Sequence, residues 1–240
     1  MRIFKKMHKN HFMQLQAPAD LEPNPPLTEQ ALMRLRRDVT LGVFEPGQKL
    51  KLDELQSRYG CSSSPLREAL SKLSQEGLIR ADERKGFRVA DISRSDLQDI
   101  TRMRLLLDVQ ALESAILHGD AEWEAAIVAA HYKLDKLERA LSDGPVALDE
   151  TWVITHKAFH LALLEACDSP RLLHWCATLF DQAERYRQFS ARHRQSSRRK
   201  STEHKRLMDA VIRRDIPTAR RLLEDHIAST HHNVLTALDF

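Results

Sequence analysis

The sequence is poor in helix-breaking residues and in cysteine. Its 240 residues include only 7 Gly and 9 Pro, which favours long helices over a turn-rich β fold. The three cysteines, Cys61, Cys167 and Cys176, form no Cys-x-x-Cys pair, so neither a zinc ribbon nor a disulfide framework is predicted. Isolated thiols are typical of a reducing compartment.

Long apolar runs are also missing. No segment approaches the roughly 18 apolar residues of a membrane-spanning helix. The basic start MRIFKKMHKN lacks the apolar core of a signal peptide. We therefore predict a cytoplasmic protein that makes no membrane contact.

Positive charge is concentrated in the first part of the chain. Residues 1–92 carry 16 Lys and Arg against 12 Asp and Glu, whereas residues 93–240 carry 21 against 22. A basic N-terminal part followed by a near-neutral part is the distribution expected if only the first domain contacts phosphate.

The first third of the chain has the element order of a winged helix-turn-helix. Residues 1–26 lack periodicity and predict a flexible tail. Apolar spacing predicts a helix from Leu27 to the Glu45-Pro46-Gly47 break, a short helix over 52–59 and a helix over 65–75. Two short strands around a turn at 83–86 follow. Residues 27–92 are therefore predicted to bind DNA through this motif and its β-hairpin wing.

Everything after Ser93 is predicted to be helical. Helices are expected near 95–118, 121–142, 149–167, 170–190, 200–214 and 217–237. The predicted fold is mainly α, with an antiparallel all-α bundle over residues 95–238.

Candidate DNA contacts lie where the second helix of the motif begins and at the tip of the wing. A helix placed in the major groove touches base edges with its N-terminal residues, and a basic turn containing glycine can approach the backbone. The candidates are Ser62, Ser63, Ser64, Arg67, Arg84, Lys85 and Gly86. The alternative is that the serines only cap the helix and Arg67 pairs with a nearby carboxylate.

Charged side chains fall on the apolar stripe of the first bundle helix. Arg104 and Asp108 share this stripe with Leu97, Ile100 and Leu107, and a charge facing a core needs a partner. They could pair with each other at a spacing of four residues. Alternatively, Arg104 could receive a ligand carboxylate through two N–H groups.

Four of the 12 histidines lie on predicted inward faces of three helices. His156 and His160 are four residues apart, and His204 and His226 follow apolar residues on their own helices. These side chains could converge on one cation, or they could simply pack in the core.

The N-terminal segment from Phe44 to Ile92 resembles the DNA-binding domain of the GntR family. The matching positions are Pro46-Gly47, Leu55, Ser62, Pro65, Arg67, Glu68, Ala69, Leu70, Leu73, Gly77, Leu78, Gly86 and Val89. The family usually has arginine where this chain has Ser63, so the operator sequence is expected to differ there. The resemblance implies a transcription regulator that binds a pseudo-palindromic operator as a homodimer.

The segment from about 95 to 236 resembles the FCD effector-binding domain of the FadR-like branch of this family. The matching residues are Arg104 and Asp108, Phe159-His160, Glu203-His204, and His226. The resemblance implies a divalent metal held by His156, His160, His204 and His226, with an anionic effector beside it. The family usually has aspartate or asparagine at position 156, and an all-nitrogen site would favour zinc or nickel-like ions.

Three further segments, beginning at Ala111, Phe159 and Leu179, resemble a glutarate-responsive member of this branch. This resemblance implies a repressor of a catabolic operon that a small carboxylate such as glutarate releases from DNA. Arg104, Asp108, Arg185 and Tyr186 would bind the effector. The alternatives are a metal-dependent hydrolase and a ligand-independent DNA-binding protein. The chain has no His-Glu-x-x-His motif and no convincing general base, so we predict that it is not an enzyme.

Overall fold

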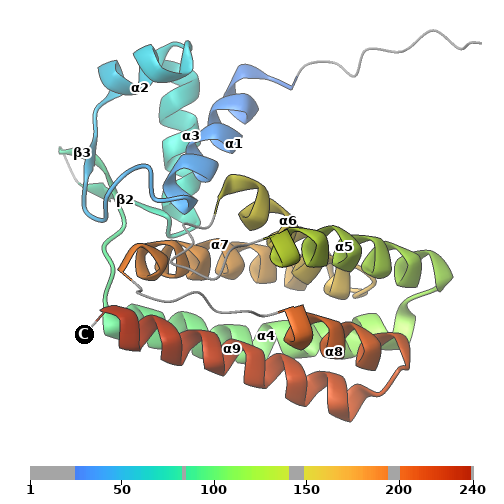
Figure 1. Ribbon diagram of the computed structural model, residues 1–240. Coiled ribbons are helices and arrows are strands. Elements are labelled where there is room, and N and C mark those ends of the chain that lie inside the picture. The colour runs from blue at the N-terminus through green and yellow to red at the C-terminus, as the bar shows by residue number, and fades with distance from the viewer. Residues whose placement is uncertain (1–24, 83–84, 141–148, 194–200, 239–240) are drawn as a thin grey trace, which may run out of the picture.

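The computed structural model describes residues 25–82, 85–140, 149–193 and 201–238. In these segments the chain forms an N-terminal lobe that sits on a bundle of long helices (Figure 1). Most of the predicted tail over residues 1–26 lies outside the described residues. No helix in the described part is both long and apolar enough to cross a membrane.

The N-terminal lobe contains three helices and a small antiparallel sheet. Its elements are α1 (Leu27–Thr40), β1 (Lys49–Leu50), α2 (Leu52–Tyr59), α3 (Ser63–Gln75), β2 (Ile79–Asp82) and β3 (Gly86–Val89). The strand order is β1-β3-β2, so the predicted hairpin gains a third strand in which Leu50 pairs with Phe87. Sequence periodicity missed β1 because two residues are too few to show alternation.

Two helix boundaries differ from the prediction. Helix α1 ends at Thr40 instead of continuing to Glu45, because Gly42 has a φ of +69° and the chain turns there. Helix α3 begins at Ser63, two residues before Pro65. The first turn of a helix tolerates proline because its N–H groups have no intrahelical acceptor.

The helical bundle contains the six helices that the sequence predicts. They are α4 (Arg94–His118), α5 (Ala121–Ala140), α6 (Glu150–Leu164), α7 (Pro170–His193), α8 (Ser201–Ile212) and α9 (Ile216–Leu238). Helix α4 packs against α7 and α9, while α5 packs against α6 and α8. The end of α9 lies beside the start of α4 (Figure 1).

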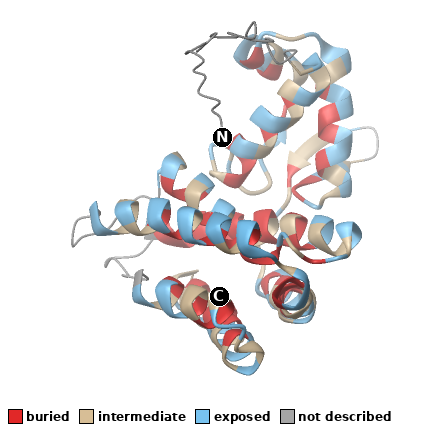
Figure 2. Cartoon of the chain, turned by 90° about the vertical axis from the view of Figure 1, so that its right-hand side faces the viewer, coloured by how far each residue is buried: buried red, intermediate tan, exposed pale blue. Residues whose placement is uncertain are grey.

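Each lobe has its own core. In the N-terminal lobe, Leu35, Leu55, Leu66 and Leu70 are among the buried residues. In the bundle, the inward helix faces are buried and the outward faces exposed (Figure 2). The bundle core differs because histidine and arginine side chains and several carboxylates are buried within it, whereas Asp38 is the carboxylate buried in the described part of the N-terminal lobe. The prediction of a mainly α fold with a small β wing is confirmed.

Candidate metal centre and nucleic-acid interface

The four predicted histidines converge in the middle of the bundle. His156 and His160 come from α6, His204 from α8 and His226 from α9, and all four are buried. One ring nitrogen from each lies within 4.8 Å of the others. The spacing of four residues on α6 puts His156 and His160 on one face, as expected for an α-helix.

Carboxylates hold two of the four rings from outside. The Nδ1 atom of His204 lies 3.1 Å from a carboxylate oxygen of Glu138, and that of His226 lies 3.4 Å from Glu203. A carboxylate on Nδ1 fixes the proton there and leaves the Nε2 lone pair directed inward, as in carboxylate–histidine–metal arrangements. The Nε2 atom of His204 is buried and has no hydrogen-bond partner. A buried nitrogen without a partner needs an explanation, and a lone pair kept for a metal ion is one.

The other two rings contact each other and an arginine. The Nε2 atoms of His156 and His160 are 3.1 Å apart, close to the separation of about 3.4 Å between two nitrogen ligands of tetrahedral zinc. Arg187 donates from Nη1 to Nδ1 of His156 across 2.9 Å. Arginine has no acceptor, so Nδ1 of His156 presents its lone pair, and the proton of a neutral ring then lies on Nε2 and points to His160.

Burial also favours the neutral form of His160. The pKa of His160 is lowered well below 6.5, chiefly by desolvation and further by His226 and His204. Neutral imidazole is the form that ligates a metal. The residues therefore fit a borderline-soft divalent ion that accepts nitrogen ligands.

Two buried arginines flank an aromatic ring beside the histidines. The guanidinium carbons of Arg104 and Arg187 lie 5.2 Å and 5.3 Å from the centre of the Phe180 ring, and this ring centre is 5.6 Å from those of both His156 and His160. These are cation–π distances. Two positive charges are thus fixed next to the histidines in a region from which water is largely excluded.

Arg104 also pairs with Asp108, as the first of the two sequence interpretations proposed. Its Nε and Nη2 atoms lie 2.9 Å and 2.8 Å from Oδ2 of Asp108, while Oδ1 has no hydrogen-bond partner. Burial raises the pKa of the Asp108 carboxyl, and Arg104 opposes that rise. Arg104, Asp108, His160 and Phe180 line a cavity of about 10 Å³, which is roughly the space that one water molecule needs.

Sequence reasoning missed Arg187 and its partner Glu184. Both are buried and form an ion pair. They continue the inward stripe of α7 that begins with Cys176 and Phe180, at steps of four and three residues. The signal that singled out Arg104 and Asp108, a charge on an apolar stripe, would have found them as well.

Arg185 and Tyr186, which were predicted to bind the effector, lie where the two lobes meet. Arg185 donates to the carbonyl of Ala90. The Tyr186 hydroxyl donates to Asp96 across 2.6 Å and accepts from the Ser93 amide. The structure therefore brings Arg104 and Asp108 to the histidines but places Arg185 and Tyr186 at the junction with the N-terminal lobe.

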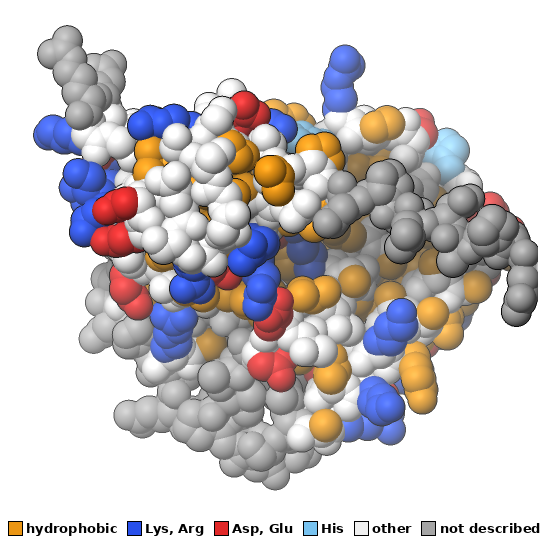
Figure 3. All heavy atoms as spheres, turned by 90° about the horizontal axis from the view of Figure 1, so that it is seen from above, with side chains coloured by type: hydrophobic (Ala, Val, Ile, Leu, Met, Phe, Trp, Pro, Cys, Tyr) orange, Lys and Arg blue, Asp and Glu red, His pale blue; other side chains and the backbone are white. Residues whose placement is uncertain are grey.

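The predicted DNA contacts on α3 are exposed at its N-terminal end. Ser62, Ser63, Ser64 and Arg67 all face solvent, and the Ser62 side chain makes no capping hydrogen bond. Among the residues that the structure describes, Arg67 has no ion pair. The alternative, capping serines and a paired arginine, is therefore not what the structure shows. The face of the molecule above the bundle carries Lys and Arg interspersed with acidic side chains (Figure 3).

The predicted wing is the β2–β3 turn. Lys85 and Gly86 are exposed there, and the φ of Gly86 is +92°, a backbone conformation that favours glycine. Arg84 lies outside the described residues. Helix α3 packs its apolar face on α1 and also contacts β2, while its N-terminal end is exposed.

A helix-turn-helix with a wing, joined to a helical bundle, is the architecture of a DNA-binding protein with a second domain. Residues 27–89 match the family of bacterial regulatory proteins called the gntR family, and residues 99–229 match the FCD domain. The chain belongs to the GntR family of transcriptional regulators, in the group that carries an FCD domain. FCD domains hold a metal ion in some members.

Known transcriptional regulators are similar in sequence to most of this chain. The transcriptional regulator BphR of Paraburkholderia xenovorans (strain LB400) is 36% identical, covering 88% of this chain and 89% of its own. The transcriptional repressor GlaR of Escherichia coli (strain K12) is 39% identical, covering 80% and 89%. The structure of E. coli McbR/YncC has a TM-score of 0.75 at 20% identity, covering 90% of this chain and 99% of its own, which shows the same fold. The prediction that the chain is not an enzyme is confirmed by this family membership.

Proposed function

We propose that this protein is a homodimeric repressor that leaves its operator when a small dicarboxylate such as glutarate binds in the helical bundle beside a divalent ion. Residues 27–92 would read DNA, and residues 95–238 would dimerise and bind the effector. The observation on which the proposal chiefly rests is the buried arrangement of Arg104 and Arg187 around Phe180, next to four histidines. The repressor GlaR, at 39% identity, supports the direction of the response.

DNA would be read by the exposed end of α3. Ser62, Ser63 and Ser64 offer hydroxyl groups that can donate or accept, and Arg67 can grip guanine or phosphate through two N–H groups. Lys85 and Gly86 of the wing, with Arg84, would contact the backbone. In a dimer, two such helices would read two half-sites about one helical turn apart.

The four histidines would hold the ion, with Glu138 and Glu203 orienting two of them. The ion would supply a fixed positive charge for one carboxylate of the effector. For His156 to ligate through Nε2, its proton must move to Nδ1, and Arg187 must then give up its hydrogen bond to that atom. Filling the site would thus separate Arg187 from His156, while the ion pair of Arg187 with Glu184 remains.

Arg104 and Arg187 would receive the carboxylate oxygens of the effector, since a planar guanidinium binds a carboxylate through two N–H groups. The cavity beside Arg104 holds about one water molecule, so a C5 diacid requires the surrounding side chains to move. Effector binding is therefore tied to a change of conformation, which is what a switch needs.

The proposal is tested by fluorescence anisotropy with labelled DNA from upstream of the protein's own operon, at fixed salt and with zinc present. Glutarate is titrated, with succinate as the control. We expect glutarate to weaken binding by about 5- to 150-fold. Operator binding that no dicarboxylate disturbs would contradict the effector assignment, and an absence of specific binding would contradict the repressor function at this operator.

Paired arginine variants locate the effector. Arg104→Lys keeps the charge but removes the planar fork, so we expect the protein to bind the operator and no longer respond to glutarate. Arg102→Lys is the matched control, because Arg102 lies on the same helix with its side chain 74% exposed. Equal responses of the two variants would exclude Arg104 from the effector site.

A further inference from the structure

Helix α7 touches both the histidine cluster and the N-terminal lobe, with different faces. Glu184 and Arg187 lie on its inward face, toward His156. Its other face carries Gln182, Arg185 and Arg192, and each of these three side chains donates to a backbone carbonyl of the N-terminal lobe or its linker. We refer to these three residues as the α7 clamp.

The clamp holds helix ends. Nε2 of Gln182 donates across 2.8 Å to the carbonyl of Glu76, the C-cap residue of α3. Nη2 of Arg192 donates to the carbonyls of Leu41 and Gly42, at 3.0 Å and 2.6 Å, where α1 ends. Terminal carbonyls lack donors within their own helix and carry partial negative charge, so these contacts satisfy groups that would otherwise depend on water.

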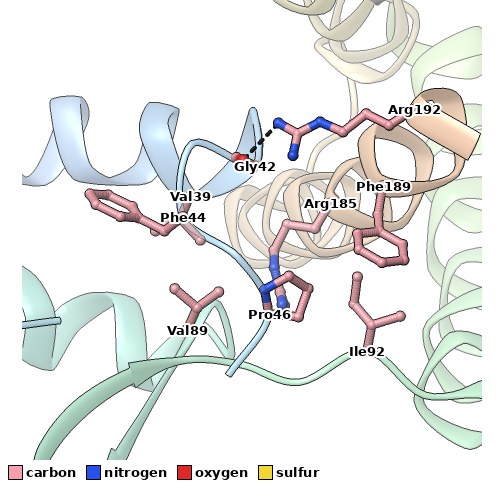
Figure 4. Close-up of a pocket in the computed structure, with 9 residues that line it drawn as sticks. All are labelled: Val39, Gly42, Phe44, Pro46, Val89, Ile92, Arg185, Phe189 and Arg192. Atoms are coloured by element: carbon pink, nitrogen blue, oxygen red, sulfur yellow. Dashed lines mark hydrogen bonds between the residues drawn. The ribbon is translucent and has the colours of Figure 1, made fainter. Parts of the chain in front are cut away.

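The third clamp residue holds the linker. Arg185 donates to the carbonyl of Ala90, directly after β3. Figure 4 shows Arg192 directed from α7 toward Gly42 and Arg185 toward Pro46, with the Phe189 ring beside Ile92. The space between them is only about 10 Å³, so this contact is closely packed.

The clamp leaves the DNA-reading end of α3 uncovered. It holds α3 at Glu76, whereas Ser62 and Arg67 project at the opposite end, about 20 Å away for a helix of this length. The contact therefore does not block DNA. It fixes the direction in which α3 points, which decides whether two half-sites can be read together in a dimer.

We propose that the α7 clamp is the device that couples the two lobes: it holds the N-terminal lobe in the orientation that binds DNA, and effector binding opens it. The coupling part rests on the proposed function above. Arg187 and Arg185 are two residues apart on one helix, so a shift of α7 that follows the release of Arg187 from His156 also moves the donors of the clamp.

The first test uses the double variant Gln182→Ala/Arg192→Ala. Neither side chain is among those proposed to bind ligand. We expect operator affinity to fall about 5-fold or more, glutarate to bind more tightly, and glutarate to cause less than a 2-fold further loss of operator binding, because linkage is reciprocal. Arg171→Ala is the control: it removes an exposed arginine of α7 that has no hydrogen bond or ion pair with a described residue. Calorimetry measures glutarate binding, and anisotropy measures operator binding.

The second test follows the clamp in the wild-type protein by amide hydrogen exchange. We expect glutarate to speed exchange in residues 41–45 and 90–93, where the clamp donors bind. Unchanged exchange in a protein that glutarate releases from DNA would overturn the coupling, and so would a double variant with the operator affinity and glutarate response of the control. If the wild type binds no dicarboxylate, the proposed function fails, whereas operator affinity of the double variant still decides whether the clamp orients the lobe.

Discussion

The two lobes differ in how many polar and charged side chains they bury. The core of the N-terminal lobe is mainly apolar, with side chains such as Leu35 and Leu66. Its buried carboxylate, Asp38, accepts a hydrogen bond from the Tyr59 hydroxyl. Its DNA-contact candidates are on the surface. The bundle buries Arg104, Glu184 and His156 among its apolar residues. Buried charge costs free energy unless it is paired.

Under the proposed function, the difference follows from what each lobe binds. A DNA duplex is larger than the domain that reads it, so its reader needs an outer surface on a rigid support. A small ion and a small diacid are bound best where water is excluded and charges act at low dielectric. Under the same proposal, the bundle gives up part of its apolar core for a binding site, and substitutions in the two cores test this contrast.

The largest effect is expected from breaking the buried ion pair of the bundle. Arg104→Ala leaves the Asp108 carboxylate buried and unpaired, and should lower the free energy of unfolding by about 3–5 kcal/mol. The double variant Arg104→Met/Asp108→Leu should recover most of that loss. Urea unfolding followed by tryptophan fluorescence reports on the bundle alone, because Trp123, Trp152 and Trp175 are the only tryptophans. An Arg104→Ala variant with an unchanged free energy of unfolding would contradict the expected difference between the two cores.

The matching change in the N-terminal lobe removes packing instead of charge pairing. Leu70 is fully buried on α3, and Leu70→Ala should cost about 2–5 kcal/mol through lost burial and a cavity. Circular dichroism should detect early loss of helix, while the tryptophan transition keeps its midpoint. Ser71→Ala, at the exposed neighbouring position, is the control. A tryptophan midpoint that shifts with Leu70→Ala would show that the two cores unfold as one.

Periodicity predicted the helices but not how they meet. All six bundle helices and the convergence of His156 with His204 follow from apolar spacing, because the 3.6-residue repeat fixes which residues face inward. Arg185 and Arg187 show the limit: Arg185 lies at the junction with the N-terminal lobe, and Arg187 lies beside the histidines. These two arginines are two residues apart on α7 and therefore lie on different faces of the helix. Only the packing of the N-terminal lobe on α7 decides which of the two faces the histidines and which faces that lobe.

Zinc should stabilise only the bundle. At a free concentration 100 times its dissociation constant, an ion bound to the folded state raises the free energy of unfolding by about 2.7 kcal/mol. We expect that shift in the tryptophan transition and no shift for the N-terminal lobe. His204→Ala should abolish it, while His232→Ala, at an exposed position on α9, should not. Equal zinc responses of the two variants would contradict the assigned ligands.

The smallest effect concerns acid, which should weaken the bundle and spare the N-terminal lobe, since residues 25–92 contain no histidine. The pKa of His160 lies well below 6.5 in the fold and near 6.5 in the unfolded chain. Between these values the unfolded chain binds more protons, so the stability of the metal-free bundle falls as pH drops through 6.5. We expect a loss of about 1 kcal/mol between pH 7 and pH 5.5 for this histidine. This loss is measured from tryptophan-fluorescence unfolding curves at both pH values in the presence of a chelator. The His160→Gln variant should lack the part of the loss that comes from His160. A bundle equally stable at both pH values would show that His160 is not held neutral by burial.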